Sequence, residues 1–268
     1  QIGSAHAAAI LPIVQTSGVT LFAPLSGPRS LYADALRPAV VPLRASYGDE
    51  VKQQIRALAA TGVQSVSIVF QDDAFGQDVL KSWQEGIGDS GLKIVSTHPL
   101  PRGSSAVEPL VDAALKSGSG AIVLAVVSSP ALVGAVQIRQ KAGSRVFAVL
   151  MSVAATSEVI DGLTGPGARG AVLFSSVMPI PTTGTNRLIR NYAELRKKYS
   201  LKPSFRGLEA YASLLIVAEQ VRRMPRFTAQ SLGAALASAP SWTVSDVYFG
   251  ARTTRYAEVF AITKHGLL

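Results

Sequence analysis

The sequence predicts an α/β protein in which parallel sheets are flanked by helices and the chain is divided between two lobes. Its 268 residues exceed the roughly 150 of an ordinary domain, which favours two domains. With 48% hydrophobic and 16% charged residues, the chain has enough apolar side chains for a substantial core. From Gly62 onward, short β-branched runs alternate with helical patterns about a dozen residues long, which is typical of βαβ units.

The middle of the chain predicts one complete parallel sheet. Five apolar runs have the composition of buried strands: 66–70, 92–95, 121–126, 146–150 and 170–174. Helical patterns separate these runs at 77–89, 107–116, 131–141 and 157–163. Glycines that stop helices follow several of them, at Gly91, Gly118 and Gly143.

The two flanks of this block predict a second lobe that is assembled from distant segments. The N-terminal flank predicts one helix over 5–16, one strand over 19–23 and a loop over 26–28. The later flank predicts helices over 186–199, 205–223 and 228–236, then strands over 246–249 and 257–263. Because the flanks complement each other, we expect a first lobe of 1–44 with 178–243, and a second of 45–177 with 244–268.

Several classes of chemistry find no support in the sequence. With no Cys and only three His, disulfides, thiolate nucleophiles and multi-His metal sites are not expected. The segment 165–170 has the letters of a dinucleotide fingerprint, but it follows a helix and precedes a strand, which is the wrong order. The pair Asp72 and Asp73 predicts a solvated loop or a helix cap. We therefore expect neither catalysis nor a cofactor.

The positive charge is concentrated in one region of the chain. The formal net charge is +9, and the stretch from Arg187 to Arg226 contains ten Lys or Arg against three Glu. We interpret this stretch as solvated helix faces, with nucleic acid or an anionic membrane surface as the alternative. No aromatic interleaving supports nucleic-acid binding, and no apolar run has the roughly 18 residues of a membrane-spanning helix.

Two serines near the N-terminus predict an anion site. Ser4 stands where the N-cap of the first helix belongs, and the residues after it are small. Ser26 follows the strand over 19–23 at its carboxyl end, the edge where open α/β sheets bind ligands. We expect both hydroxyls to face one crevice, and the alternative for Ser4 is an ordinary helix cap.

Four segments resemble one family. These are FQDDAFGQD at 70–78, RASYGDE at 44–50, LEAYA at 208–212 and AEQVRR at 218–223. They resemble the branched-chain amino-acid-binding (Leu/Ile/Val-binding) family of periplasmic substrate-binding proteins, which have the type I periplasmic-binding fold and serve ABC transporters. The resemblance keeps the order of the segments over essentially the whole chain. It implies two α/β lobes that are joined by three crossovers.

The resemblance assigns three residues of the first lobe to a ligand site. Ser4 matches the hydroxyl that grips the ligand carboxylate in the family. Leu25 and Ser26 match the companion loop. The resemblance also implies that family members have βα units ahead of Gly3, so we expect a truncated first lobe, a signal peptide in the missing part and association of the chain with itself.

Three residues of the second lobe complete the site that the resemblance implies. Phe75 matches an aromatic side chain that closes over the ligand, with a place in the core as the alternative. Ser128 matches a position that is often aromatic. Ser152 stands where amino-acid binders have an acid for the ligand ammonium. This departure favours an aliphatic or aromatic carboxylate over an α-amino acid, because an unpaired buried ammonium is costly.

The resemblance implies a periplasmic solute-binding component of an ABC importer. Its lobes are expected to close on a small carboxylate or amino-acid-like ligand and to present the closed shape to a membrane permease. The alternative is a ligand-sensing receptor or regulatory domain of the same fold. A DNA-binding segment or a spanning helix would favour that alternative, and the sequence shows neither.

Overall fold

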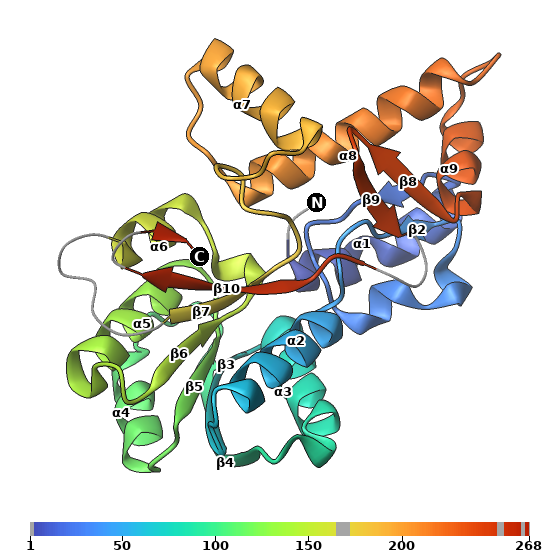
Figure 1. Cartoon of the computed structure of the whole chain (residues 1–268). Coiled ribbons are helices and arrows are strands. Elements are labelled where there is room, and N and C mark those ends of the chain that lie inside the picture. The colour runs from blue at the N-terminus through green and yellow to red at the C-terminus, as the bar shows by residue number, and fades with distance from the viewer. Residues whose placement is uncertain (1–2, 165–171, 251–254, 264–265, 268) are drawn as a thin grey trace. The chain divides into compact units, whose positions relative to one another are not determined.

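The computed structural model describes residues 3–164, 172–250, 255–263 and 266–267. The chain forms two compact units (Figure 1). Unit 1 contains residues 1–46 and 177–256, and unit 2 contains residues 47–176 and 257–268. The glycine-rich segment 165–170 and the first two residues of the strand expected at 170–174 lie outside the described residues.

Unit 2 is built on a seven-stranded sheet with the order β11-β10-β7-β6-β5-β3-β4. The strands are β3 (Ser65–Asp72), β4 (Lys93–Pro101), β5 (Ala121–Ala125), β6 (Phe147–Leu150), β7 (Val172–Ser176), β10 (Glu258–Thr263) and β11 (Gly266–Leu267). Strands β4, β3, β5, β6 and β7 are parallel, whereas β10 pairs antiparallel with both β7 and β11. The parallel part of the sheet confirms the βαβ prediction.

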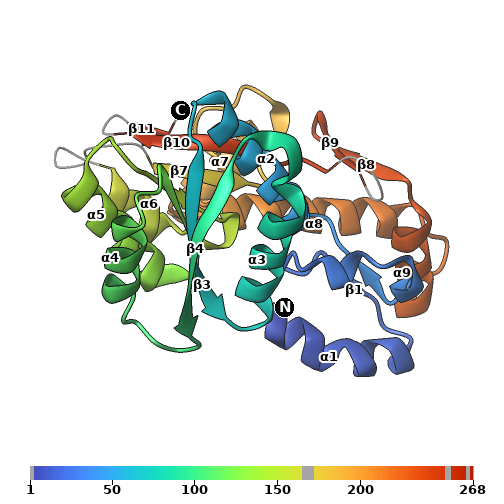
Figure 2. The same cartoon turned by 90° about the horizontal axis from the view of Figure 1, so that it is seen from below.

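Helices cover both faces of this sheet. They are α2 (Tyr47–Ala60), α3 (Ala74–Gly86), α4 (Glu108–Lys116), α5 (Ser128–Ala142) and α6 (Ser157–Leu163). Figure 2 shows α2 and α3 on one face and α4, α5 and α6 on the other. The face under α2 and α3 contains a continuous apolar cluster that includes Trp83, Leu58 and Ile68. Because both faces are buried, the central strands are almost uninterrupted apolar runs.

Unit 1 combines one N-terminal helix with three later helices and four short strands. Its elements are α1 (Ser4–Ser17), β1 (Leu21–Phe22), β2 (Val40–Val41), α7 (Arg187–Tyr199), α8 (Phe205–Arg222), α9 (Ala229–Ser238), β8 (Ser241–Val244) and β9 (Val247–Gly250). Within the described residues, β1 pairs only with β2, in parallel, and β8 forms an antiparallel hairpin with β9. The side chains of Asn186, Ser204 and Thr228 cap α7, α8 and α9.

The third boundary between the units differs from the expected one. We expected 244–268 in the second lobe, but residues 244–256 belong to unit 1. The reason is that β9 pairs with β8 through the register Trp242 to Phe249, which keeps the hairpin with α8 and α9. In the part of the chain that the structure describes, no helix is long and apolar enough to cross a membrane.

Candidate functional site

The six residues that the sequence assigns to a ligand site fall in two groups. Ser4, Leu25 and Ser26 lie in unit 1, and Phe75, Ser128 and Ser152 lie in unit 2.

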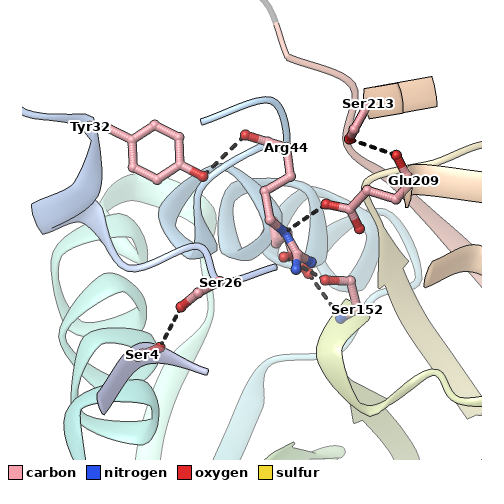
Figure 3. A network of polar contacts seen from close by, with 8 residues as sticks. Ser4, Ser26, Tyr32, Arg44, Ser152, Glu209 and Ser213 are labelled. Atoms are coloured by element: carbon pink, nitrogen blue, oxygen red, sulfur yellow. Dashed lines mark hydrogen bonds and ion pairs between the residues drawn. The ribbon is translucent and has the colours of Figure 1, made fainter. Parts of the chain in front are cut away.

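In unit 1, the start of α1 and the loop after β1 bring the two predicted serines together. The Oγ atoms of Ser4 and Ser26 lie 3.0 Å apart and are buried (Figure 3). The Gly3 N–H also donates to the Leu25 carbonyl at 3.4 Å, which fixes the loop against the helix start. The two hydroxyls therefore lie together, and the expectation that they face a ligand crevice stays a prediction.

Ser4 is not the N-cap that the sequence predicts. The N-cap is Gly3, with φ 94° and ψ 143°, and Ser4 is the first helical residue. A glycine adopts this left-handed φ without strain, which moves the helix start back by one residue. As a glycine, the N-cap makes no side-chain capping bond. The positive end of the helix dipole and two buried hydroxyls therefore lie together, an arrangement suited to a carboxylate.

Leu25 lines a cavity next to this serine pair. The cavity has a volume of about 450 Å³ and lies between the β1 loop and α8. Its walls are largely apolar, with Phe22, Leu214 and Val217 in the lining, and they also include the charged residues Arg206 and Glu209. Within unit 1, Leu25 therefore lies between the polar start of α1 and this cavity.

A buried ion pair in unit 1 was not predicted as part of the site. Arg44 Nε lies 3.8 Å from Glu209 Oε1, and both side chains are at most 5% exposed. The Tyr32 hydroxyl donates to the Arg44 carbonyl at 3.1 Å, and the Ser213 hydroxyl donates to the Glu209 carbonyl at 2.7 Å (Figure 3). Both charged residues occur in the segments that carry the family resemblance, which was the available signal.

In unit 2, the three predicted residues follow the carboxyl ends of three neighbouring parallel strands. Phe75 follows β3, Ser128 begins α5 directly after β5, and Ser152 follows β6. Strands β3 and β5 are adjacent, yet the chain leaves β3 toward β4 and leaves β5 toward β6. Such a topological switch point is where open α/β sheets bind ligands.

Phe75 packs in the core of unit 2. Its side chain is 4% exposed, and its ring lies 5.1 Å from the Tyr47 ring in an edge-to-face arrangement. The Asp73 carboxylate accepts hydrogen bonds from the Phe75 and Gly76 N–H groups, so a side chain of the protein already caps α3. The interpretation of Asp73 as a helix cap is confirmed, and the start of α3 is less suited to an anion than the start of α1.

Ser152 lies against an acid that the sequence analysis did not consider. The Ser152 N–H and Oγ donate to the two carboxylate oxygens of Glu50, at 2.9 and 2.8 Å. The Ser175 hydroxyl donates to Glu50 Oε2 at 2.6 Å. Glu50 is fully buried in the first turn of α2, 102 residues before Ser152 in the chain. Its place in the RASYGDE segment was the only signal in the sequence.

The resolved pKa shifts lie away from these side chains. Burial lowers the pKa of Arg139, whose Nη1 donates to the Leu163 carbonyl at 2.7 Å, and burial also lowers the pKa of His98. The hydrogen bond from Lys141 lowers the pKa of Asp112 at the surface. Among the described residues, no group of three or more His, Asp or Glu is arranged to hold a metal ion.

Solved structures of the same architecture define the class of protein. A substrate-binding periplasmic protein from Ralstonia solanacearum has a TM-score of 0.84 and 24% identity, with 99% of this chain and 78% of that chain covered. A possible leucine/isoleucine/valine-binding protein from Rhodopirellula baltica SH 1 has a TM-score of 0.85 and 19% identity, with 100% and 75% covered. These similarities show the type I periplasmic-binding fold.

A third similar structure differs in its ligand. It is a solute-binding protein of an ABC transporter from R. palustris in complex with benzoate, with a TM-score of 0.79, 12% identity, and 100% and 75% of the two chains covered. No curated protein sequence matches this chain significantly. The family described as periplasmic binding protein matches residues 1–262. The chain therefore belongs to the periplasmic binding protein family, whose members bind solutes.

Proposed function

We propose that this chain is the periplasmic solute-binding component of an ABC importer, and that units 1 and 2 are lobes that close on a small carboxylate or amino-acid-like ligand. The observation that carries the proposal is the buried Ser4 and Ser26 pair at the start of α1. The helix dipole and a hydroxyl donor stabilise a carboxylate there without an arginine or a lysine. The periplasmic location and the membrane permease follow from the family to which the chain belongs.

The other wall of the proposed site is the carboxyl edge of the unit 2 sheet. Ser128 and Ser152 belong to this edge, and closure would bring it toward the ligand. The carboxylate specificity is supported by the two helix starts, because the Asp73 carboxylate already caps α3 whereas the N-cap of α1 is a glycine. The benzoate bound by one similar structure is an acid of the proposed class.

Isothermal titration calorimetry with a set of small aliphatic, aromatic and amino acids tests this function. We expect at least one acid to bind, and Ser4→Ala to weaken its binding by about 1–3 kcal/mol, because the variant strands a buried charged acceptor. Ser17→Ala is the matched control, since its hydroxyl lies at the other end of α1, where it donates to the Val14 carbonyl and accepts from the Val19 N–H. Failure of every acid to bind, or equal affinities of wild type and Ser4→Ala, would contradict the proposal.

A further inference from the structure

The outward side of α1 carries no charged side chain. The 14 residues of this helix include no Asp, Glu, Lys or Arg. Even so, Ala9, Pro12 and Ile13 are exposed, and Ile13 is 66% exposed. Surface helices normally present charged or polar side chains on their outward face. The outward side of α1 is therefore better suited to an apolar environment than to water.

The C-terminal end of α1 lies next to the start of α9. Gly18 follows α1, and Gln230 Nε2 lies 3.7 Å from the place where a Cβ of Gly18 would stand. Thr20 and Gly233 are also in close contact, because a Cβ on Gly233 would overlap Thr20 Oγ1. Figure 2 shows the end of α1 and α9 on the same side of unit 1. Val19, which is 51% exposed, therefore lies near the turn between α8 and α9.

This turn combines three arginines with an exposed aromatic side chain. Arg222, Arg223 and Arg226 are all exposed, and Phe227, which follows them, is 61% exposed. The Glu219 carboxylate pairs with Arg223. Three arginines and one glutamate leave this group with a net positive charge. Cationic and apolar side chains are thus exposed together at one end of α8.

We propose that unit 1 docks on an anionic lipid bilayer through the exposed side of α1, Val19 and the turn 222–227. Phe227 and Val19 enter the boundary between headgroups and acyl chains, and the guanidinium groups bind lipid phosphates. The outward side of α1 can approach the bilayer without the cost of desolvating a charge. This docking surface goes beyond the proposed function and does not depend on the identity of the ligand.

The exposed apolar side chains favour a bilayer over the other interpretations of the basic stretch from Arg187 to Arg226. On α7, Arg187 and Arg190 are exposed together with Glu194, as on an ordinary solvated helix. Nucleic acid would bind the arginines of the turn mainly through its phosphates. An anionic bilayer uses both the arginines and the apolar side chains beside them.

Sedimentation with sucrose-loaded vesicles tests the inference on the whole chain. One set of vesicles contains equal amounts of phosphatidylglycerol and phosphatidylcholine, and the other contains phosphatidylcholine alone. At about 0.15 M salt, exposed charges more than about 8 Å from the bilayer are largely screened. We expect the chain to bind the anionic vesicles at least about tenfold more strongly than the neutral ones.

The decisive variant removes the charge of the turn and keeps its side chains polar and exposed. It combines Arg222→Gln, Arg223→Gln and Arg226→Gln. We expect the partition coefficient on anionic vesicles to fall about fivefold for each arginine, and about 100-fold in all.

A second triple variant is the matched control, because it removes the same charge from exposed positions of unit 2. It combines Lys52→Gln, Arg56→Gln and Lys116→Gln. We expect its partition coefficient to stay within about twofold of the wild type.

Two variants of Phe227 test the apolar contact. Phe227→Ser should lower the partition coefficient at least about tenfold, because the aromatic ring no longer leaves water. Phe227→Trp should show a blue shift of its fluorescence when anionic vesicles are added. Trp83 and Trp242 are buried, so we expect their emission to stay constant.

Three results would overturn the inference. One is vesicle binding that the arginine variant and Phe227→Ser leave unchanged. Another is binding of an oligonucleotide by the turn when the vesicles do not bind. The third is a dimer in light scattering that Phe227→Ser dissociates, again without vesicle binding, since the surface would then be covered by a second copy of the chain.

Discussion

Units 1 and 2 keep their shape by different means. Unit 2 encloses a seven-stranded sheet between helices, and its apolar cluster joins α2 and α3 to the sheet. Unit 1 has two-stranded sheets within the described residues, and one of its buried apolar clusters contains Ala7, Leu31 and Val40. Further apolar side chains are buried in its later helices, among them Leu208 and Ile216. Its exposed side chains include Ile13 at 66% and Leu214 at 67%. The difference teaches that in unit 2 a single large sheet holds the residues after its strands in place, whereas in unit 1 the described sheets are short and helices contribute much of the buried surface.

The polar contacts of the two units differ in the same way. In unit 1, the loop with Leu25 and Ser26 is held to α1 by the serine pair and by one backbone hydrogen bond. In unit 2, Ser152 is held by Glu50 within a network that joins α2 to the strands β6 and β7. We therefore expect the wall in unit 1 to adapt to the ligand more than the wall in unit 2.

Two leucines give the largest expected effect and compare the cores directly. Leu58 is fully buried in the cluster of unit 2, and Leu31 is 1% exposed in the smaller cluster of unit 1. We expect Leu58→Ala to lower the free energy of unfolding of its unit by about 4 kcal/mol and Leu31→Ala by about 2 kcal/mol, because a rigid site collapses less around a cavity. Urea unfolding followed by hydrogen exchange would separate the two units. Equal losses of unfolding free energy in the two variants would contradict the difference between the two cores.

A pH effect of smaller size should be confined to unit 2. Burial lowers the pKa of His98, whose Nε2 lies 2.9 Å from Ser96 Oγ. A base with a lowered folded pKa loses stability as the pH falls through its unfolded value of about 6.5, because the unfolded chain then binds the proton more readily. His98→Gln should therefore make unit 2 less sensitive to a change from pH 7 to pH 5. If wild type and His98→Gln show the same pH dependence of the free energy of unfolding in urea, His98 is not the source of the pH effect.

The strands of unit 2 were predictable because burial on both faces makes them apolar runs, but helix α2 was not predicted. Its buried positions follow a helical spacing, yet Glu50 and Gln54 occupy two of them. Polar residues on the buried face interrupt the hydrophobic period that predicts a helix. Strand β4 was expected to end at Val95 and continues to Pro101, because as an edge strand it alternates between exposed and half-buried residues.

The candidate site was predictable only where local sequence determines position. Ser4 starts a helix and Ser26 lies in the loop after a strand, and these local signals were enough to expect the two hydroxyls to lie together. The contact between Glu50 and Ser152 joins residues that are far apart in the chain, so no local sequence pattern predicts it. The expected association of the chain with itself stays a prediction, with the exposed Leu214 in its favour.

A crystal structure of the chain with the tightest-binding acid tests the central claim most directly. We expect a carboxylate oxygen about 3 Å from Ser4 Oγ at the start of α1. A ligand whose carboxylate lies on Ser152, or one bound away from α1, would contradict the account.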